Sequence, residues 1–250
     1  MNIRQQLGIL RSRIMYYAKP RNRRRLMDFY AQWVGPDSLC FDVGAHLGNR
    51  TDAWLAMGAR VVAVEPQPAC IRYLKRHFGH NPRFTLMEAA LGERPARLPL
   101  HVSELTPTIS TLAGADWRKA MADKTSFHVQ WDQQIEVPVY SLEQLIEKHG
   151  LPDFCKLDVE DFELPILKGL QTPIPTLSFE YFIPSIQSAL DCVDELERIG
   201  PYEYNWSFGE SQQFEGVNWI GAQEMKQILA SYGEADRSGD VYARLTQTKL

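Results

Sequence analysis

Residues 41–65 read FDVGAHLGNRTDAWLAMGARVVAVE and constrain the fold more than any other segment. An apolar strand ends in Asp42, a tight loop with Gly44 and Gly48 follows, and a helix comes next. A second apolar strand then ends in Glu65. The segment therefore predicts a β-loop-α-β unit with a glycine-rich first turn, and units of this kind bind nucleoside-containing cofactors.

The charges around this loop indicate which cofactor. Glu65 lies where a carboxylate can accept hydrogen bonds from both hydroxyls of a ribose. The pyrophosphate of a dinucleotide would approach the helix N-terminus close to Asp42, which would repel it. S-Adenosylmethionine carries no phosphate, and Asp42 could pair with its ammonium group. The D-x-G-x-x-x-G spacing also departs from the dinucleotide pattern, so S-adenosylmethionine is favoured over a bare turn without a ligand.

The rest of the chain alternates apolar strands with amphipathic helices, which predicts an α/β fold. We expect a doubly wound, mostly parallel sheet with an antiparallel edge strand and ligands at the carboxyl ends of its strands. The polar residues 103–133 form the longest irregular stretch and predict a lid. Further strands are expected at 84–87, 98–102, 135–140, 154–159, 177–180, 202–206 and 241–245, so that Asp42, Glu65, Asp158 and Glu180 all lie at carboxyl ends.

A second group of acids lies in residues 156–169, KLDVEDFELPILKG. The predicted strand delivers Asp158 to the edge of the sheet, Glu160 follows in the loop, and Glu163 begins a helix. Lys156 shares a strand face with Asp158 and could neutralise a carboxylate there. The acids predict a general base, a metal site or a site for hydroxyl groups, whereas Glu163 is expected to offset the helix dipole. The alternative is an acidic helix start on the surface.

Six segments together resemble the FkbM-type family of S-adenosylmethionine-dependent methyltransferases. They are FDVGAHLGNRT, VVAVEPQP, ALG at 90–92, PTISTL at 107–112, KLDVEDFELPILKGL and LSFE, and the first and fifth are the specific ones. The resemblance covers about residues 38–245. It implies a class I methyltransferase-like (Rossmann-like) sheet. It also implies O-methylation of a hydroxyl on a sugar, a glycolipid or a secondary metabolite.

By the same resemblance, Asp158 and Glu160 are the predicted catalytic residues. They would remove the proton of the acceptor hydroxyl directly or through a divalent metal, for which we assign no ligands. The residues predicted to bind the cofactor are Asp42, Gly44, His46, Gly48, Asn49, Glu65, Gln67 and Glu88.

Two positions depart from the family pattern. His46 stands where the family usually shows Asn, which affects the hydrogen bonding of the loop, and it is a second candidate base ranked behind the acids. Asp161 stands where the family usually shows Gly, and a positive φ at this position is less favourable for Asp. Residues 204–211, YNWSFGES, either contact the acceptor or form a packed turn.

The N-terminal segment differs in charge from the rest of the chain. Residues 1–26 hold eight Lys or Arg and no acid, whereas the remainder holds 19 basic and 31 acidic residues, a net charge of −12. An acidic body disfavours nucleic acid as a partner. We therefore divide the chain into a basic helical extension, 1–34, and a cofactor-binding domain, 35–250.

The first predicted helix carries apolar residues at helical spacing with arginines between them. It could lie on an anionic membrane, resemble a transit segment, cover the cofactor cleft, or dock on the domain through its apolar stripe. The stripe consists of Ile3, Leu7, Leu10, Ile14 and Tyr17. Lys19-Pro20 is expected to end this helix, and a second helix is predicted at 23–33.

Three classes of function follow. The first is a methyltransferase acting on a small molecule or a glycan, the second a nicotinamide-dependent oxidoreductase, and the third a noncatalytic binding protein at a membrane. The four cysteines are widely spaced without a C-x-x-C pair, and Cys40 and Cys155 fall in predicted buried strands. Reduced thiols and the absence of a recognisable secretory signal predict a cytoplasmic protein, with peripheral membrane contact through 1–26 as an option.

Overall fold

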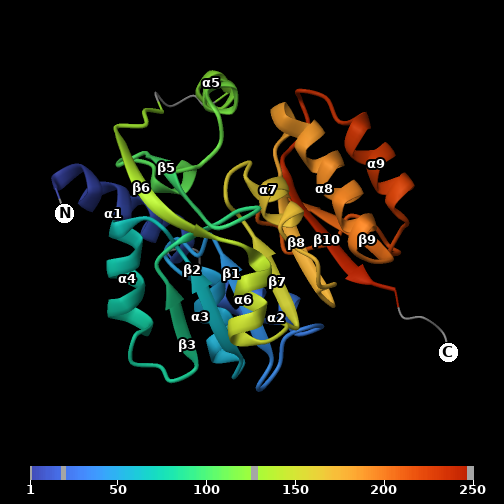
Figure 1. Ribbon diagram of the computed structural model, residues 1–250, viewed down its shortest axis with the longest axis horizontal. Helices are drawn as coiled ribbons and strands as arrows, with labels where there is room; N and C mark the ends of the chain where they lie inside the picture. The colour runs from blue at the N-terminus through green and yellow to red at the C-terminus, as the bar shows by residue number, and fades with distance from the viewer. Residues whose placement is uncertain (1, 18–20, 125–128, 247–250) are drawn as a thin grey trace.

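A seven-stranded sheet forms the centre of the structure, a computed structural model that describes residues 2–17, 21–124 and 129–246 (Figure 1). Its strand order is β3-β2-β1-β7-β8-β10-β9. β10 runs antiparallel to both β8 and β9, and the other pairs are parallel. The predicted doubly wound, mostly parallel sheet with an antiparallel strand in its edge region is confirmed. The strands are β1 (Leu39–Val43), β2 (Arg60–Val64), β3 (Phe84–Met87), β7 (Phe154–Leu157), β8 (Thr176–Tyr181), β9 (Tyr202–Phe208) and β10 (Gly239–Leu245).

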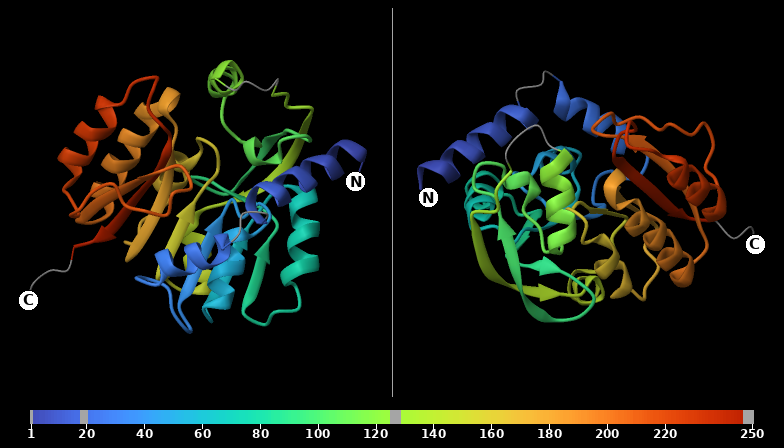
Figure 2. Two further views of the ribbon diagram at one scale, coloured as in Figure 1. Left: turned by 180° about the vertical axis from the view of Figure 1, so that it is seen from behind. Right: turned by 90° about the horizontal axis from the view of Figure 1, so that it is seen from above.

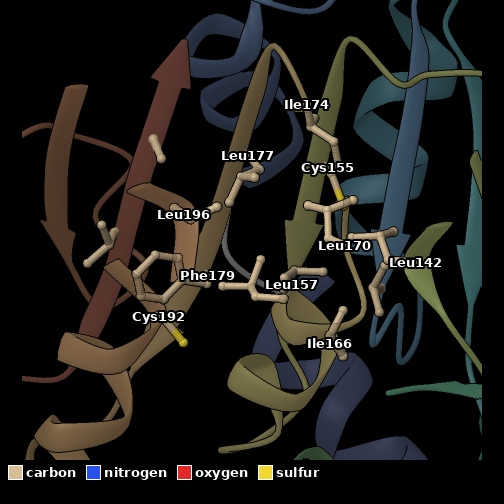
Figure 3. Packing of buried hydrophobic residues seen from close by; sticks show 14 of the residues in the cluster. Leu142, Cys155, Leu157, Ile166, Leu170, Ile174, Leu177, Phe179, Cys192 and Leu196 are labelled. Atoms are coloured by element: carbon tan, nitrogen blue, oxygen red, sulfur yellow. The ribbon is translucent and has the colours of Figure 1, made fainter. Parts of the chain in front are cut away.

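Helices cover both faces of the sheet (Figures 1 and 2). Side chains alternate along each strand, so Phe41 of β1 belongs to the core cluster that includes residues of α6 to α9, whereas its neighbour Cys40 belongs to the cluster that includes residues of α2 and α3. Figure 3 shows part of the first cluster, with Leu157, Phe179 and Leu196 among its residues. The helices are α2 (Asn22–Tyr30), α3 (Asn49–Ala56), α4 (Pro68–Phe78), α6 (Leu142–His149), α7 (Glu163–Lys168), α8 (Ile186–Ile199) and α9 (Ala222–Ser231).

Local sequence signals explain where several elements begin. Ser141 and Gln144 form the predicted capping box, in which each side chain accepts from the backbone of the other and so starts α6. Pro68 occupies the first turn of α4, where no backbone N–H is needed. Cys40 and Cys155 are free thiols in buried strands, as predicted.

A small sheet stands above the carboxyl end of the main one. It has the order β4-β6-β5 and contains β4 (Ala90–Leu91), β5 (Ala96–Val102) and β6 (Gln133–Tyr140). The stretch predicted to be irregular, 103–133, instead contains a 3-10 turn, η1 (Pro107–Ile109), and helix α5 (Ala115–Lys124). The prediction was wrong here because Trp117 and Met121, one helical turn apart, pack inward in an otherwise polar segment.

The first helix, α1 (Ile3–Tyr17), docks on the domain, but through the face opposite to its apolar stripe. Its buried residues are Gly8, Ile9 and Ser12, and the predicted docking by the stripe is therefore wrong. Gly8 permits the close approach, because a Cβ built on it would lie 2.1 Å from the carbonyl oxygen of Glu104. The predicted break at Lys19-Pro20 lies outside the described residues.

The close approach at Gly8 yields a stability prediction. Gly8→Ala should push α1 away from the backbone at Glu104 and lower the free energy of unfolding by about 1–3 kcal/mol, the usual effect of overpacking. Urea denaturation and hydrogen exchange of the α1 amides would measure this. Gly114→Ala is the matched control, since a Cβ there would meet nothing within 4 Å. Equal stability of the two variants would contradict the docking.

Candidate functional site

A cavity lies at the carboxyl ends of β1, β2 and β7, where Gly44, Glu65 and Asp158 each follow directly after a strand. It holds about 740 Å³ of empty space, part of it open to solvent, which is a usual size for a small-molecule site. Helix α1 contributes Tyr16 to the wall, and η1 with the residues after it closes another side. Of the predicted site residues, Gly44, His46, Asn49, Glu65, Gln67, Asp158 and Glu160 line the cavity, whereas Asp42, Gly48 and Glu88 do not.

The glycine loop is shaped by contacts within the protein. Gly44 has a φ of +81°, and a Cβ on it would lie 1.8 Å from the carbonyl oxygen of Asp158. The absence of a side chain therefore lets β1 and β7 continue side by side into the site. Gly48 has a φ of +76° at the start of α3, where a Cβ would lie 2.7 Å from the ring of Phe78. Both glycines are required by the fold of the loop itself.

Asp42 holds the N-terminus of α3. Its buried Oδ2 accepts hydrogen bonds from the backbone N–H of Thr51 at 3.1 Å and from the hydroxyl of Thr51 at 2.6 Å. Gly48, which precedes the helix, has no side chain to cap it, and Asp42 takes over this task. The position does not support the expected pairing of Asp42 with the cofactor's ammonium group.

Glu65 lies at the cavity wall with both oxygens oriented by the backbone. Its Oε2 accepts from the N–H of His46 at 2.8 Å and its Oε1 from the N–H of Gln67 at 2.7 Å. Burial raises the pKa of Glu65 to about 8, against the opposing effect of these two hydrogen bonds. Each oxygen has a second lone pair that can accept a hydrogen bond from a ligand. The backbone hydrogen bonds hold both oxygens in fixed positions.

His46 occupies the middle of the loop with a φ of +50°. Both ring nitrogens are buried without a hydrogen-bond partner, and the ring meets Tyr16 edge-on with centroids 5.6 Å apart. Burial lowers the pKa of His46 to about 4, so the imidazole is neutral at pH 7. The hydrogen-bonding capacity of the ring is thus unused within the protein.

The remaining predicted cofactor residues have different surroundings. Gln67 ties the cavity wall to η1, because its amide donates to the carbonyl of Pro107 at 3.0 Å and accepts from the hydroxyl of Ser110 at 2.9 Å. Asn49 accepts from the N–H of Arg50 at 3.0 Å. Glu88 is half-exposed outside the cavity and pairs with Lys75 at 2.5 Å.

An acidic cluster forms the other end of the cavity. One carboxylate oxygen from each of Asp158, Glu160 and Glu180 lies within 4.8 Å of the others. Two buried cations face it. The ammonium of Lys156 lies 3.6 Å from Asp158 and 2.6 Å from Asp240, and a guanidinium nitrogen of Arg50 lies 3.2 Å from Asp158. The predicted neutralising role of Lys156 is therefore borne out by these distances.

The cations divide the acids by protonation. Burial raises the pKa of Asp158, but Lys156 and Arg50 outweigh it and hold the pKa below its ordinary value. Burial and the charge of Asp158 raise the pKa of Glu160 well above its ordinary value, and burial with Glu160 does the same for Glu180. Asp158 is thus ionised while its two neighbours tend to keep protons.

The turn that carries Glu160 is strained. Glu160 and Asp161 have φ values of +57° and +69°, so two consecutive residues other than glycine adopt the left-handed region. Two hydrogen bonds hold the turn: Thr111 donates to the carbonyl of Glu160 at 2.6 Å, and the N–H of Val159 donates to Glu163 at 2.9 Å. Glu163 is buried and braces this loop, rather than only facing the helix dipole from the surface.

Three residues near the site were not predicted as site residues, and a fourth belongs to a segment that was predicted either to contact the acceptor or to form a packed turn. Arg50 follows the glycine loop within the quoted motif, and Glu180 was noted only as a strand end. Glu210, from the segment 204–211, reaches the site through Arg50 at 3.2 Å. Tyr16 comes from α1, and only the docked position of that helix brings it to the cavity.

The comparisons with known proteins agree with this arrangement. The model of the methyltransferase FkbM domain matches residues 42–233. The fold is that of a class I methyltransferase-like protein, and the chain belongs to the FkbM methyltransferase family. The resemblance stated from the sequence is thereby confirmed. A search of curated proteins gives no match.

Solved structures with a similar fold are distant in sequence. A precorrin-6Y C5,15-methyltransferase from Geobacter metallireducens shows 10% identity and a TM-score of 0.47, covering 92% of this chain and 90% of that one. A putative O-methyltransferase from Klebsiella pneumoniae shows 9% identity and a TM-score of 0.45, covering 99% and 91%. Scores of this size carry no argument about the acceptor.

The buried imidazole yields a prediction about pH. The folded protein keeps His46 neutral down to a pKa of about 4, whereas the unfolded chain protonates it near 6.5. Stability should therefore fall as the pH drops from about 6.5 to 4, by up to about 3 kcal/mol. His46→Asn should lose this component, so the difference in unfolding free energy between variant and wild type should change across that window. A constant difference in urea denaturation at pH 4.5 and 7.5 would contradict the burial.

Proposed function

We propose that this chain transfers the methyl group of S-adenosylmethionine to a hydroxyl group of a sugar, a glycolipid or a secondary metabolite. The observation that carries the proposal is the single cavity that joins the glycine loop and Glu65 to the acids Asp158 and Glu160. The family match supports methyl transfer, and the acids support a hydroxyl acceptor.

The charges of the cavity fit this cofactor. Three acids, Glu65, Asp158 and Glu160, line it together with one guanidinium, Arg50, which is already paired with Asp158. Asp158, the acid whose pKa is held below its ordinary value, attracts a sulfonium or ammonium group and repels a pyrophosphate, which argues against the nicotinamide-dependent alternative. Apolar residues on the side of the small sheet, among them Leu91 and Leu100, offer a surface for the adenine ring.

The residues divide the remaining work between them. When bound, the cofactor supplies an electrophilic methyl group, which leaves sulfur as a new bond to the acceptor oxygen forms. Glu65 would accept hydrogen bonds from the ribose hydroxyls. Asp158, kept ionised by Lys156 and Arg50, would hold the acceptor hydroxyl in position. Glu160, whose raised pKa makes its carboxylate the stronger base, would take the hydroxyl proton.

Glu65 can be tested by affinity. Glu65→Gln keeps the shape of the side chain but removes one acceptor of the ribose hydroxyls. It should weaken binding of S-adenosylhomocysteine by about 1.5–3 kcal/mol, the range for a hydrogen bond to a charged group. Isothermal calorimetry on wild type and variant would measure this, with NAD as the negative ligand. Wild-type affinity in a folded variant, or tighter binding of NAD, would contradict the assignment.

The acidic pair can be tested once an acceptor is found by a screen with labelled cofactor against sugars, glycolipids and polyketides. Glu160→Gln should lower kcat by at least about a hundredfold, the lower range for loss of a general base. Cofactor affinity should stay near wild type. Asp158→Asn should mainly raise the KM for the acceptor. Unchanged kcat in Glu160→Gln would remove Glu160 from the mechanism.

The raised pKa of Glu160 also predicts the shape of the pH profile. A base must be deprotonated to act, so kcat should be lost as the pH falls through a pKa well above the ordinary range of a glutamate. The measurement is kcat at saturating acceptor from pH 5 to 9. A profile that stays flat down to an ordinary carboxyl pKa of about 4.3 would contradict the role.

A further inference from the structure

The outward side of α1 is apolar and uncovered. We call it the outer α1 face and define it as Ile3, Leu7, Leu10 and Ile14; Tyr17 ends the stripe, but its hydroxyl donates to the carbonyl of Leu47 at 2.9 Å. Ile3 is 75% exposed, Ile14 59%, Leu7 53% and Leu10 50%. The four residues recur every three or four positions, and at 3.6 residues per turn they lie on the side of the helix opposite to the docked residues Gly8, Ile9 and Ser12.

Arginines border this face along both edges. By the same helical spacing, Arg4 and Arg11 lie along one edge of the outer α1 face and Arg13 along the other, and all three are exposed. Arg21, Arg23, Arg24 and Arg25 follow at the start of α2, also exposed. No acid occurs among residues 1–26, whereas the rest of the chain has a net charge of −12. The chain thus carries an excess of positive charge at this end, part of which is paired with acids of the body, Arg4 with Asp132 and Arg23 with Asp52.

We propose that the outer α1 face docks on an anionic lipid surface, with its apolar side chains between the headgroups and its arginines against the lipid phosphates. An apolar stripe with basic borders on a helix is the arrangement that binds in the plane of a membrane interface. Long arginine side chains can extend toward the headgroups while the stripe enters the apolar boundary. The helix lies on the surface in this arrangement, and no helix among the described residues is long and apolar enough to cross a membrane.

A second copy of the chain is the other conceivable occupant, and two observations disfavour it. The stripe extends over only two heptads of α1, whereas coiled coils need about three or four. Pairing two copies would also bring arginine borders together without any acid from residues 1–26 to oppose them. An anionic bilayer offers an apolar boundary to the stripe and negative charge to the arginines.

Docking in this way would orient the molecule. The acidic body would be repelled from the same surface that attracts α1, so the chain would be held by its N-terminal end. Tyr16, on the docked side of α1, lines the cavity, so the helix would lie between the cavity and the lipid surface. Lipid binding goes beyond the proposed methyl transfer and needs neither cofactor nor acceptor, so either idea can fail alone.

Vesicle co-sedimentation with the full chain tests the proposal. Vesicles of phosphatidylcholine mixed with phosphatidylglycerol should bind the protein, and pure phosphatidylcholine vesicles should bind it at least about tenfold more weakly. Raising the salt concentration should release the protein from the mixed vesicles. The triple variant Leu7→Gln, Leu10→Gln, Ile14→Gln should lower affinity for the mixed vesicles at least about tenfold.

The chain offers a matched control. Val217 and Leu151 are exposed apolar residues away from α1, at 97% and 44%. The double variant Val217→Gln, Leu151→Gln should bind the mixed vesicles as wild type does, and circular dichroism should show both variants folded. Three results would overturn the proposal: no binding of wild type to mixed vesicles, equal binding of the triple variant, or a wild-type dimer that the triple variant converts to a monomer.

Discussion

The buried ammonium of Lys156 is the interaction on which the site depends. Its side chain is wholly inaccessible to solvent, and it faces Asp240 of β10 and Asp158 at the end of β7. Burying a single unpaired charge at this depth would cost a prohibitive amount of free energy. The two carboxylates and the lysine therefore either stabilise one another as charged groups or are all neutral. Lys156 helps to hold the pKa of Asp158 below its ordinary value, whereas burial, and after it the charge of Asp158, raises the pKa of Glu160.

Arg50 extends this network across the fold. It begins in α3, pairs with Asp158 beyond β7 and with Glu210 in the loop after β9, and so connects the glycine loop to the opposite half of the sheet. The three elements are far apart in sequence. The packing of the sheet therefore fixes the positions of these carboxylates and cations, and the charges in the cavity are preorganised for a ligand.

The parts of the structure that could be predicted are those with local causes. The glycine loop and its two strands follow from residues a few positions apart, and the sequence predicted them, whereas the turn at Asp161 was expected only from the family resemblance. Asp42 shows the limit of local reasoning. Its carboxylate accepts from the N-terminus of a helix that Gly48 leaves uncapped, so the helix competes with a ligand for Asp42, and residue spacing does not reveal this. Arg50 and Glu210 meet only through tertiary folding, so no local pattern could pair them.

The first helix illustrates a different limit. Hydrophobic periodicity identified its apolar side correctly, but the domain binds the side with Gly8 and Ser12, because small residues allow backbones to approach closely. Apolar residues mark a face that must be covered by something, and periodicity alone does not say by what. The prediction for the α5 segment was wrong for the opposite reason. Its two inward-facing residues, Trp117 and Met121, are surrounded in the sequence by polar residues, so no apolar periodicity was apparent.

The double position of α1 has a thermodynamic consequence. The helix supplies Tyr16 to the cavity wall, and it is held to the body by Gly8 and by the amides of Asn2 and Gln5, which both donate to Glu104. A ligand that touches Tyr16 must therefore favour the docked helix over the detached one. By thermodynamic linkage, anything that pulls α1 off the domain weakens the binding of that ligand by the same factor. Ligand binding in the cavity and docking of the N-terminal helix are therefore coupled equilibria.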